Sequence, residues 1–127
     1  GVIVMMSCVE LNIADSLFQQ NHDVNVYSDQ TVVRITNTEF ADNNAEYRRF
    51  ISVANTEFYL SGSTFHRSNN FQAQGSAVHG RSLKTAWISS NNFHKLNAFR
   101  GGAIFLQETP NATIYSPRSC PARLVAA

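Results

Sequence analysis

Apolar and polar residues alternate along much of the chain, which is the pattern of β-strands. Side chains in a strand point to opposite faces at every second residue, whereas those of a helix repeat every 3.6 residues. No window of the sequence shows a sustained helical stripe. Four alternating segments each end on a phenylalanine, and they read LNIADSLF, VRITNTEF, FYLSGSTF and AWISSNNF. The pattern therefore predicts a protein built from short strands.

These four segments align as copies of one repeat. Their phenylalanines are 22, 25 and 28 residues apart, and an aliphatic residue stands five positions before each of them. An asparagine lies three or four residues after each phenylalanine, and a second apolar strand follows. The aligned columns are the phenylalanines Phe18, Phe40, Phe65 and Phe93, the aliphatic residues Ile13, Ile35, Leu60 and Ile88, and the asparagines Asn21, Asn43, Asn69 and Asn97.

A repeat of this length made of short strands predicts an all-β fold, a right-handed parallel β-helix of about four to five rungs. Equivalent residues in such a coil stack about 4.8 Å apart, the spacing of hydrogen-bonded strands. We therefore expect a ladder of phenylalanines in the core, and asparagines at the corners, where this residue type tolerates left-handed backbone. A β-sandwich also has short strands and frequent turns, but it does not require phenylalanine at a fixed offset from the other two columns.

The repeats cover residues 1–115, and we expect 116–127, which contain two prolines, to form a cap or an extended arm. The residues at Gly1–Val4 align with Gly102–Phe105, so the chain begins within a repeat, and its last copy fades after the matching point. We expect a segment of a longer β-helix, or ends that stack head-to-tail on other copies, because unpaired strand edges recruit further chains. Two segments of variable length, His66–Gln74 and His94–Arg100, are predicted to be loops that meet partners or neighbouring subunits.

Two short motifs resemble the repeats of chlamydial polymorphic outer membrane proteins. The motif F-x-x-N occurs at Phe18–Asn21 and Phe40–Asn43, and G-G-A-I occurs at Gly101–Ile104. The resemblance implies a right-handed parallel β-helix displayed at the cell surface, with an adhesive or structural role. The third and fourth copies read F-x-x-x-N instead.

The composition of the chain argues against strongly charged partners. The sequence has 10 Lys and Arg against 9 Asp and Glu, and only 15% of its residues are charged. Such a balance gives no long-range attraction to nucleic acid or to anionic lipid. No apolar run reaches the roughly 20 residues of a membrane-spanning helix. We expect an extracellular or cell-surface protein with no nucleic-acid partner and no membrane span.

The sequence gives no catalytic signature. Glycoside hydrolysis usually needs two carboxylates roughly 5–10 Å apart, and no outward column of the repeat stacks two acids. Three fragments faintly resemble polygalacturonase motifs but lack the paired aspartates, namely Asn37–Glu39, Asn55–Glu57 and His79–Arg81. His66 and His94 fall on adjacent rungs, and no third metal ligand aligns with them. We expect a non-enzymatic structural or adhesive module without cofactor or metal, and keep a carbohydrate-active fragment, a polysaccharide lyase or hydrolase, as the alternative.

The remaining candidates concern contacts at the surface. Trp87 lies between two inward positions, so it is predicted to face outward, either open to a sugar or protein partner or covered by the segment Gln72–Gly80. Asn111 begins a sequon for N-glycosylation. About four rungs, or ~19 Å, separate Cys8 from Cys120, and a disulfide requires Cα atoms within ~7 Å. The two cysteines are therefore expected either as a bridge between stacked subunits or as free thiols.

Overall fold

The structure of the chain is a computed structural model that describes residues 3–21, 24–43, 49–74, 77–100 and 102–115. These residues form fourteen strands and no helix. The first sheet, sheet A, contains β1 (Ile3–Met6), β4 (Val26–Asp29), β7 (Ile51–Ala54), β10 (Val78–Arg81) and β13 (Ile104–Gln107). Sheet B contains β2 (Glu10–Ala14), β5 (Val32–Thr36), β8 (Glu57–Ser61), β11 (Thr85–Ser89) and β14 (Ala112–Tyr115). Sheet C contains β3 (Leu17–Gln19), β6 (Glu39–Asn43), β9 (Thr64–Gln74) and β12 (Asn92–Arg100).

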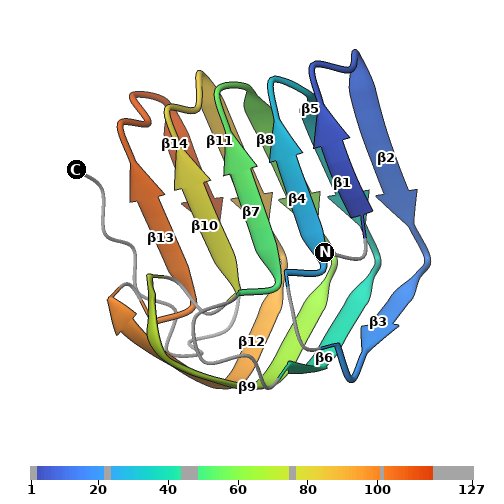
Figure 1. Ribbon diagram of the computed structural model, residues 1–127, viewed down its shortest axis with the longest axis vertical. Coiled ribbons are helices and arrows are strands. Elements are labelled where there is room, and N and C mark those ends of the chain that lie inside the picture. Colours follow the sequence, from blue (N-terminus) through green and yellow to red (C-terminus); the bar gives the residue numbers. More distant parts are fainter. Residues whose placement is uncertain (1–2, 22–23, 44–48, 75–76, 101, 116–127) are drawn as a thin grey trace.

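The chain winds through the three sheets in turn, so that each strand pairs with the strand three places further along the sequence (Figure 1). Every pair is parallel. The strands β1 to β12 make four complete turns, and β13 and β14 belong to a fifth. The predicted parallel β-helix is confirmed, and the sandwich, which is built from antiparallel sheets, is excluded.

The predicted phenylalanine ladder fills the core on the side of sheet C. The ring centroids of Phe18 and Phe40 are 5.0 Å apart, those of Phe40 and Phe65 are 4.7 Å apart, and those of Phe65 and Phe93 are 5.2 Å apart. The interplanar angles are 7°, 1° and 14°, so the rings stack almost in parallel. Phe50, which the alignment did not include, packs at a tilt against both Phe40 and Phe65 at 5.9 Å.

The aliphatic column lines the inner face of sheet B. Strand pairing places Ile13 beside Ile35, then Leu60, Ile88 and Ile114 on successive turns. The first four of these side chains are buried. Because side chains alternate between the two faces of a strand, this register also determines which residues of sheet B point outward.

The two segments that we predicted as loops are strands. His66–Gln74 lies within β9 and His94–Arg100 within β12, and these strands pair in parallel from Asn92 with Thr64 to Arg100 with Gln74. The prediction was wrong because these segments are mostly polar and lack the alternation of a half-buried strand. Pairing with the next turn satisfies the backbone groups whatever the side chains are.

Left-handed backbone recurs at three places in each turn, but not where we expected it. The positions that follow sheet A are Ser7, Gln30, Asn55, Ser82 and Glu108, those that follow sheet B are Asp15, Asn37, Gly62 and Ser90, and those in or after the strands of sheet C are Gln20, Asp42, Arg67 and Lys95. The last group lies one or two residues before the asparagines that we had assigned to this corner. Asn21 donates a hydrogen bond to the side chain of Asn25, and the side chains of Asn43, Asn69 and Asn97 lie outside the described part.

Candidate functional site

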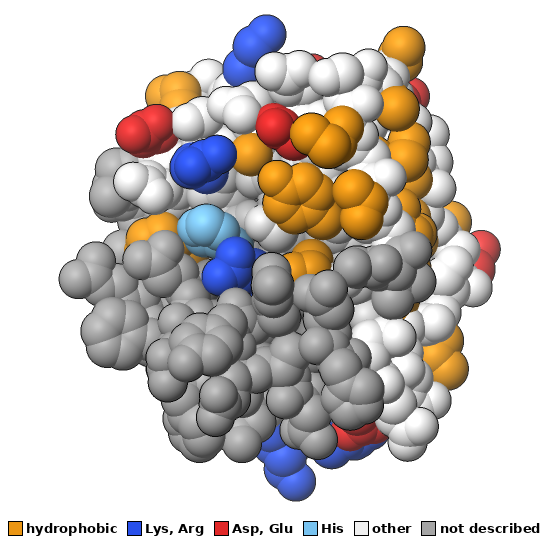
Figure 2. Space-filling model, in the orientation of Figure 1, with side chains coloured by type: hydrophobic (Ala, Val, Ile, Leu, Met, Phe, Trp, Pro, Cys, Tyr) orange, Lys and Arg blue, Asp and Glu red, His pale blue; other side chains and the backbone are white. Residues whose placement is uncertain are grey.

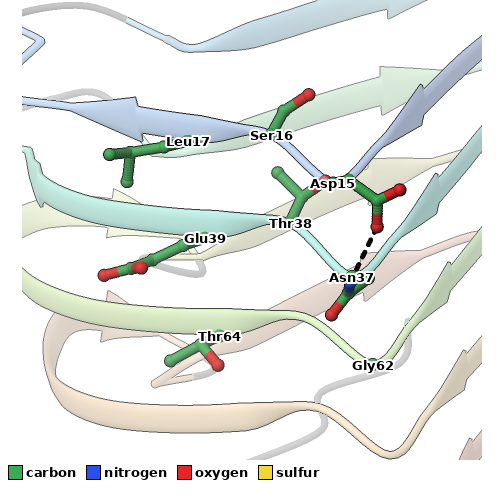
Figure 3. Close-up of a pocket in the computed structure, with 8 residues that line it drawn as sticks. All are labelled: Asp15, Ser16, Leu17, Asn37, Thr38, Glu39, Gly62 and Thr64. Carbon is green, nitrogen blue, oxygen red and sulfur yellow. Dashed lines mark hydrogen bonds between the residues drawn. The ribbon is translucent and has the colours of Figure 1, made fainter.

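An open hollow of about 390 Å³ lies along the corner between sheets B and C (Figure 3). It is lined by three successive turns of the coil. Figure 3 shows the Asp15 side chain pointing to Asn37 on one rim, while Leu17, Glu39 and Thr64 extend along the strands of sheet C. The full lining consists of Asp15, Ser16, Leu17, Asn37, Thr38, Glu39, Gly62 and Thr64.

Thr38, which lines the hollow, belongs to a hydrogen-bonded stack of corner residues. The Thr38 hydroxyl donates to the carbonyl of Thr36 at 2.9 Å, and the amide of Thr38 donates to Ser63 Oγ at 3.2 Å. The amide of Ser63 in turn donates to Asn91 Oδ1 at 2.9 Å on the next turn. A left-handed residue followed by a bonded Ser, Thr or Asn thus makes each corner. The fragment Asn37–Glu39, which resembled part of an enzyme motif, has this structural role.

The two carboxylates of the hollow are each engaged with a neighbouring turn. Asn37 Nδ2 donates to Asp15 Oδ1 at 2.7 Å. Glu39 Oε1 lies 2.7 Å from His66 Nε2, which belongs to β9. The hollow therefore offers hydrogen-bonding groups along its rim, but its acids bond to side chains of the coil and not to each other.

The two histidines of the outer face of sheet C lie side by side, as their common offset predicted. His94 is the register partner of His66, and His94 is exposed. Among the described residues, no group of three or more His, Cys, Asp or Glu side chains is placed to hold a metal ion. On the same face Arg67 makes a two-pronged ion pair with Asp42. The hydrogen bond from Arg67 holds the pKa of Asp42 below its usual value, and the same contact raises the pKa of Arg67.

The outer face of sheet B carries an exposed aromatic patch that includes Trp87. Alternation along β11 points Trp87 outward, and 48% of its surface is exposed. Its indole N–H donates to Ser89 Oγ at 3.2 Å. On the preceding turn, the Arg34 guanidinium lies 4.2 Å from the centroid of the Tyr59 ring, a cation–π contact. Of the two predicted alternatives for Trp87, the exposure to solvent is the one observed.

The outer face of sheet A holds a half-buried histidine, His79. Figure 2 shows this face, with apolar side chains gathered near β1 and β4. On β10, the His79 ring packs against Phe105 with centroids 5.4 Å apart, and its Nδ1 lies 3.2 Å from Arg49 Nη1. Burial, followed by the charges of Arg49 and Arg81, lowers the pKa of His79 from 6.5 to about 4. The Nε2 atom of His79 is buried without a hydrogen-bond partner in the described part.

The sheets of the described chain end at bare strand edges. Sheets A, B and C begin at β1, β2 and β3, and no described strand pairs with the outer edges of these three. Phe18 on β3 has a ring neighbour on one side only and is 8% exposed, whereas Phe40 on the next turn is 0% exposed. The first turn therefore presents partly covered core residues and unpaired backbone groups.

Cys8 is an exposed free thiol in the described part, and Cys120 lies outside the described residues. Asn111 is exposed, and its Nδ2 makes a long contact of 3.4 Å with the carbonyl of Lys84. Both the inter-subunit disulfide and the glycan at Asn111 stay predictions.

Comparisons with known proteins add no family to this description. No family model matches the sequence, and neither a curated protein nor a solved structure matches the chain. The repeats are thus those of a parallel β-helix, while the resemblance to the chlamydial repeats finds no support in these comparisons. The part of the chain that the structure describes contains no helix long and apolar enough to cross a lipid bilayer.

Proposed function

We propose that this chain is a non-enzymatic module of an extracellular or cell-surface β-helix, with a structural or adhesive role. Its ends join further rungs, supplied either by a longer chain or by another copy. The proposal rests chiefly on the edge at β1, β2 and β3, with which no strand of the described residues pairs. Edges of this kind template the addition of another strand.

The arrangement of polar groups supports a stiff rod. Neighbouring turns are tied by side-chain hydrogen bonds at the corners, for example from Ser7 to Gln30 at 2.8 Å, from Asn55 to Asp29 at 2.8 Å and from Ser82 to Glu108 at 2.9 Å. Each of these contacts links residues on adjacent turns. A rod held this way presents long lateral faces, which suit adhesion better than a single deep pocket.

The short F-x-x-N and G-G-A-I motifs support the same proposal through their resemblance to the chlamydial surface repeats. The resemblance is confined to a few residues per turn, such as Phe18–Asn21 and Gly101–Ile104. It favours a surface-displayed passenger, and its bearing on function is weaker than its bearing on fold.

Strand addition at the open edge can be tested with one pair of variants. In a parallel sheet, successive residues of a strand direct their backbone N–H and C=O groups alternately to the strand on one side and to the strand on the other side. The carbonyl of Val9 and the amide of Asp15 both bond to the adjacent turn, so the amide of Asn12 points off the open edge of β2. Asn12→Pro removes this donor, while Asn12→Val keeps it.

We expect the purified chain to associate end to end in sedimentation velocity and to form short rods in electron micrographs. Asn12→Pro should shift the population to monomers, and Asn12→Val should behave as the parent chain does. A monodisperse monomer at high protein concentration would contradict the proposal. The alternative is a carbohydrate-active fragment that uses the carboxylates of the hollow. It would be favoured if the parent chain cleaves a polysaccharide and Glu39→Gln does not.

A further inference from the structure

The outer face of sheet B, which lies behind sheet A in Figure 1, carries aromatic, charged and hydroxyl side chains. Strand pairing arranges its central residues in one row across five turns. The row consists of Asn12, Arg34, Tyr59, Trp87 and Thr113. We call this row and its outward neighbours on the same five strands the Trp87 face.

Each charged group of the Trp87 face bonds to a neighbouring side chain of that face. Arg34 Nε donates to Glu10 Oε1, and the same guanidinium covers the Tyr59 ring. The Tyr59 hydroxyl donates to Glu57 Oε1 at 3.1 Å. The only cation of this row, Arg34, is therefore already paired, whereas nucleic-acid binding needs free cations.

The groups that stay available are hydroxyls and one large ring. Trp87 satisfies its only hydrogen-bond donor with Ser89 on its own strand, yet almost half of the side chain is exposed. What an approaching molecule meets is therefore mainly the apolar surface of the indole. Around it lie outward hydroxyl side chains that can donate and accept, namely Thr36, Ser61, Thr85, Ser89, Thr113 and Tyr115.

We propose that the Trp87 face binds a neutral polysaccharide whose chain runs along the axis of the coil. The C–H groups on the face of a sugar ring stack on an indole, and the sugar hydroxyls then reach the Ser and Thr side chains beside it. Successive turns are about 4.8 Å apart, comparable to the rise of one sugar unit in an extended glycan. This places one sugar on the Trp87 ring and its two neighbours at the turns of Tyr59 and Thr113. The inference deepens the adhesive part of the proposed function and rests on it.

Trp87 is also a built-in reporter, because the chain contains a single tryptophan. The full chain is titrated with three neutral polysaccharides, a mixed-linkage β-glucan, a mannan and an arabinoxylan, and with polygalacturonate as a charged comparator. We expect a saturable change in tryptophan emission with at least one neutral polymer and little dependence on salt.

Affinity electrophoresis in gels that contain the same polymers compares variants without relying on fluorescence. Trp87→Ala should weaken retardation at least about tenfold, and Trp87→Tyr, which keeps an aromatic ring, should retain part of it. Tyr27→Ala is the matched control, since Tyr27 is an exposed aromatic residue on the outer face of sheet A, with 39% exposure. Circular dichroism confirms that each variant is folded.

Three results would overturn the inference: no neutral polymer binds, Trp87→Ala binds as the parent chain does, or polygalacturonate alone binds and requires Arg34. The same samples are examined by sedimentation, which reports self-association, and for released sugars, which report cleavage. These two measurements distinguish a failure of the glycan-binding inference from a failure of the proposed function. Glycan binding without self-association would remove the end-joining part of that proposal and leave the Trp87 face intact. Self-association without glycan binding would do the reverse.

Discussion

The phenylalanine ladder predicts how much stability a single ring contributes at each level of the coil. Phe65 is 0% exposed and contacts three rings, those of Phe40, Phe93 and Phe50. Phe18 is 8% exposed and contacts the ring of Phe40 alone in the described part. Replacing a buried phenylalanine by alanine costs about 3–5 kcal/mol, and each aromatic pair contributes roughly 0.5–1.5 kcal/mol beyond its buried area.

The two substitutions should therefore differ by the two extra ring contacts of Phe65. We expect Phe65→Ala to reduce the free energy of unfolding by about 5 kcal/mol and Phe18→Ala by about 3 kcal/mol, a difference of roughly 1–3 kcal/mol. Because domains of this size are stable by only about 5–15 kcal/mol, Phe65→Leu provides a milder variant at the same site.

The assay is equilibrium unfolding in urea, followed by far-ultraviolet circular dichroism. The dependence of the unfolding free energy on urea should be similar in all variants, so that the shift in midpoint reports stability. Equal losses for the two alanine variants, or a loss below about 1 kcal/mol for Phe65→Ala, would refute the stacked core, since cavity costs in packed interiors exceed that value.

Three further predictions concern the corners and faces of the coil. Gly62 has φ of +62°, and a Cβ added there would make ordinary van der Waals contact with the Asn37 backbone at 3.8 Å. Gly62→Ala should therefore cost about 1 kcal/mol in urea unfolding, through its left-handed backbone and not through a clash. Gly62→Asn should cost less because Asn37 holds the equivalent left-handed position. A larger loss for the asparagine variant would count against this view of the corner. His79 has its pKa lowered from 6.5 to about 4, so the unfolded chain takes up a proton first and stability should fall as the pH drops from about 6.5 towards 4. His79→Gln should show a shallower decline than the parent chain between pH 7 and pH 5, and identical declines would contradict the burial of this ring. When the chain is expressed through a eukaryotic secretory pathway, a glycan at Asn111 should slow its migration in a gel, and Asn111→Gln should restore the faster migration. If the parent chain migrates as the unglycosylated protein does, the prediction is refuted.

The core columns could be predicted from the sequence because stacking requires the same kind of side chain at every turn. Phe40 stacks on Phe65 of the next turn, so both must occupy the same position in their strands. Each therefore lies five residues after an aliphatic residue of sheet B. The outward position of Trp87 followed from the same alternation. Phe50 escaped the alignment, since it precedes β7 at a position that no other turn fills with an aromatic residue.

The rest of the surface depends on contacts between turns that a linear pattern does not contain. The corner fragment Asn37–Glu39 looked like part of a motif until its backbone conformation and the bond from Asn37 to Asp15 were known. The lengths of β9 and β12 were hidden by their polar side chains, because backbone pairing alone holds these strands together. The burial of His79 likewise depends on packing against Phe105 and Arg49 from other turns.

Parallel stacking of the turns can be tested most directly by nuclear Overhauser contacts in the isotope-labelled chain. The account predicts contacts between the Hα and amide protons of strands three places apart, linking Val33 with Phe58 and Phe40 with Phe65, together with contacts between the two phenylalanine rings. Close Hα–Hα contacts between sequence neighbours such as β5 and β6, which are characteristic of antiparallel pairing, would contradict the coil and everything inferred from it.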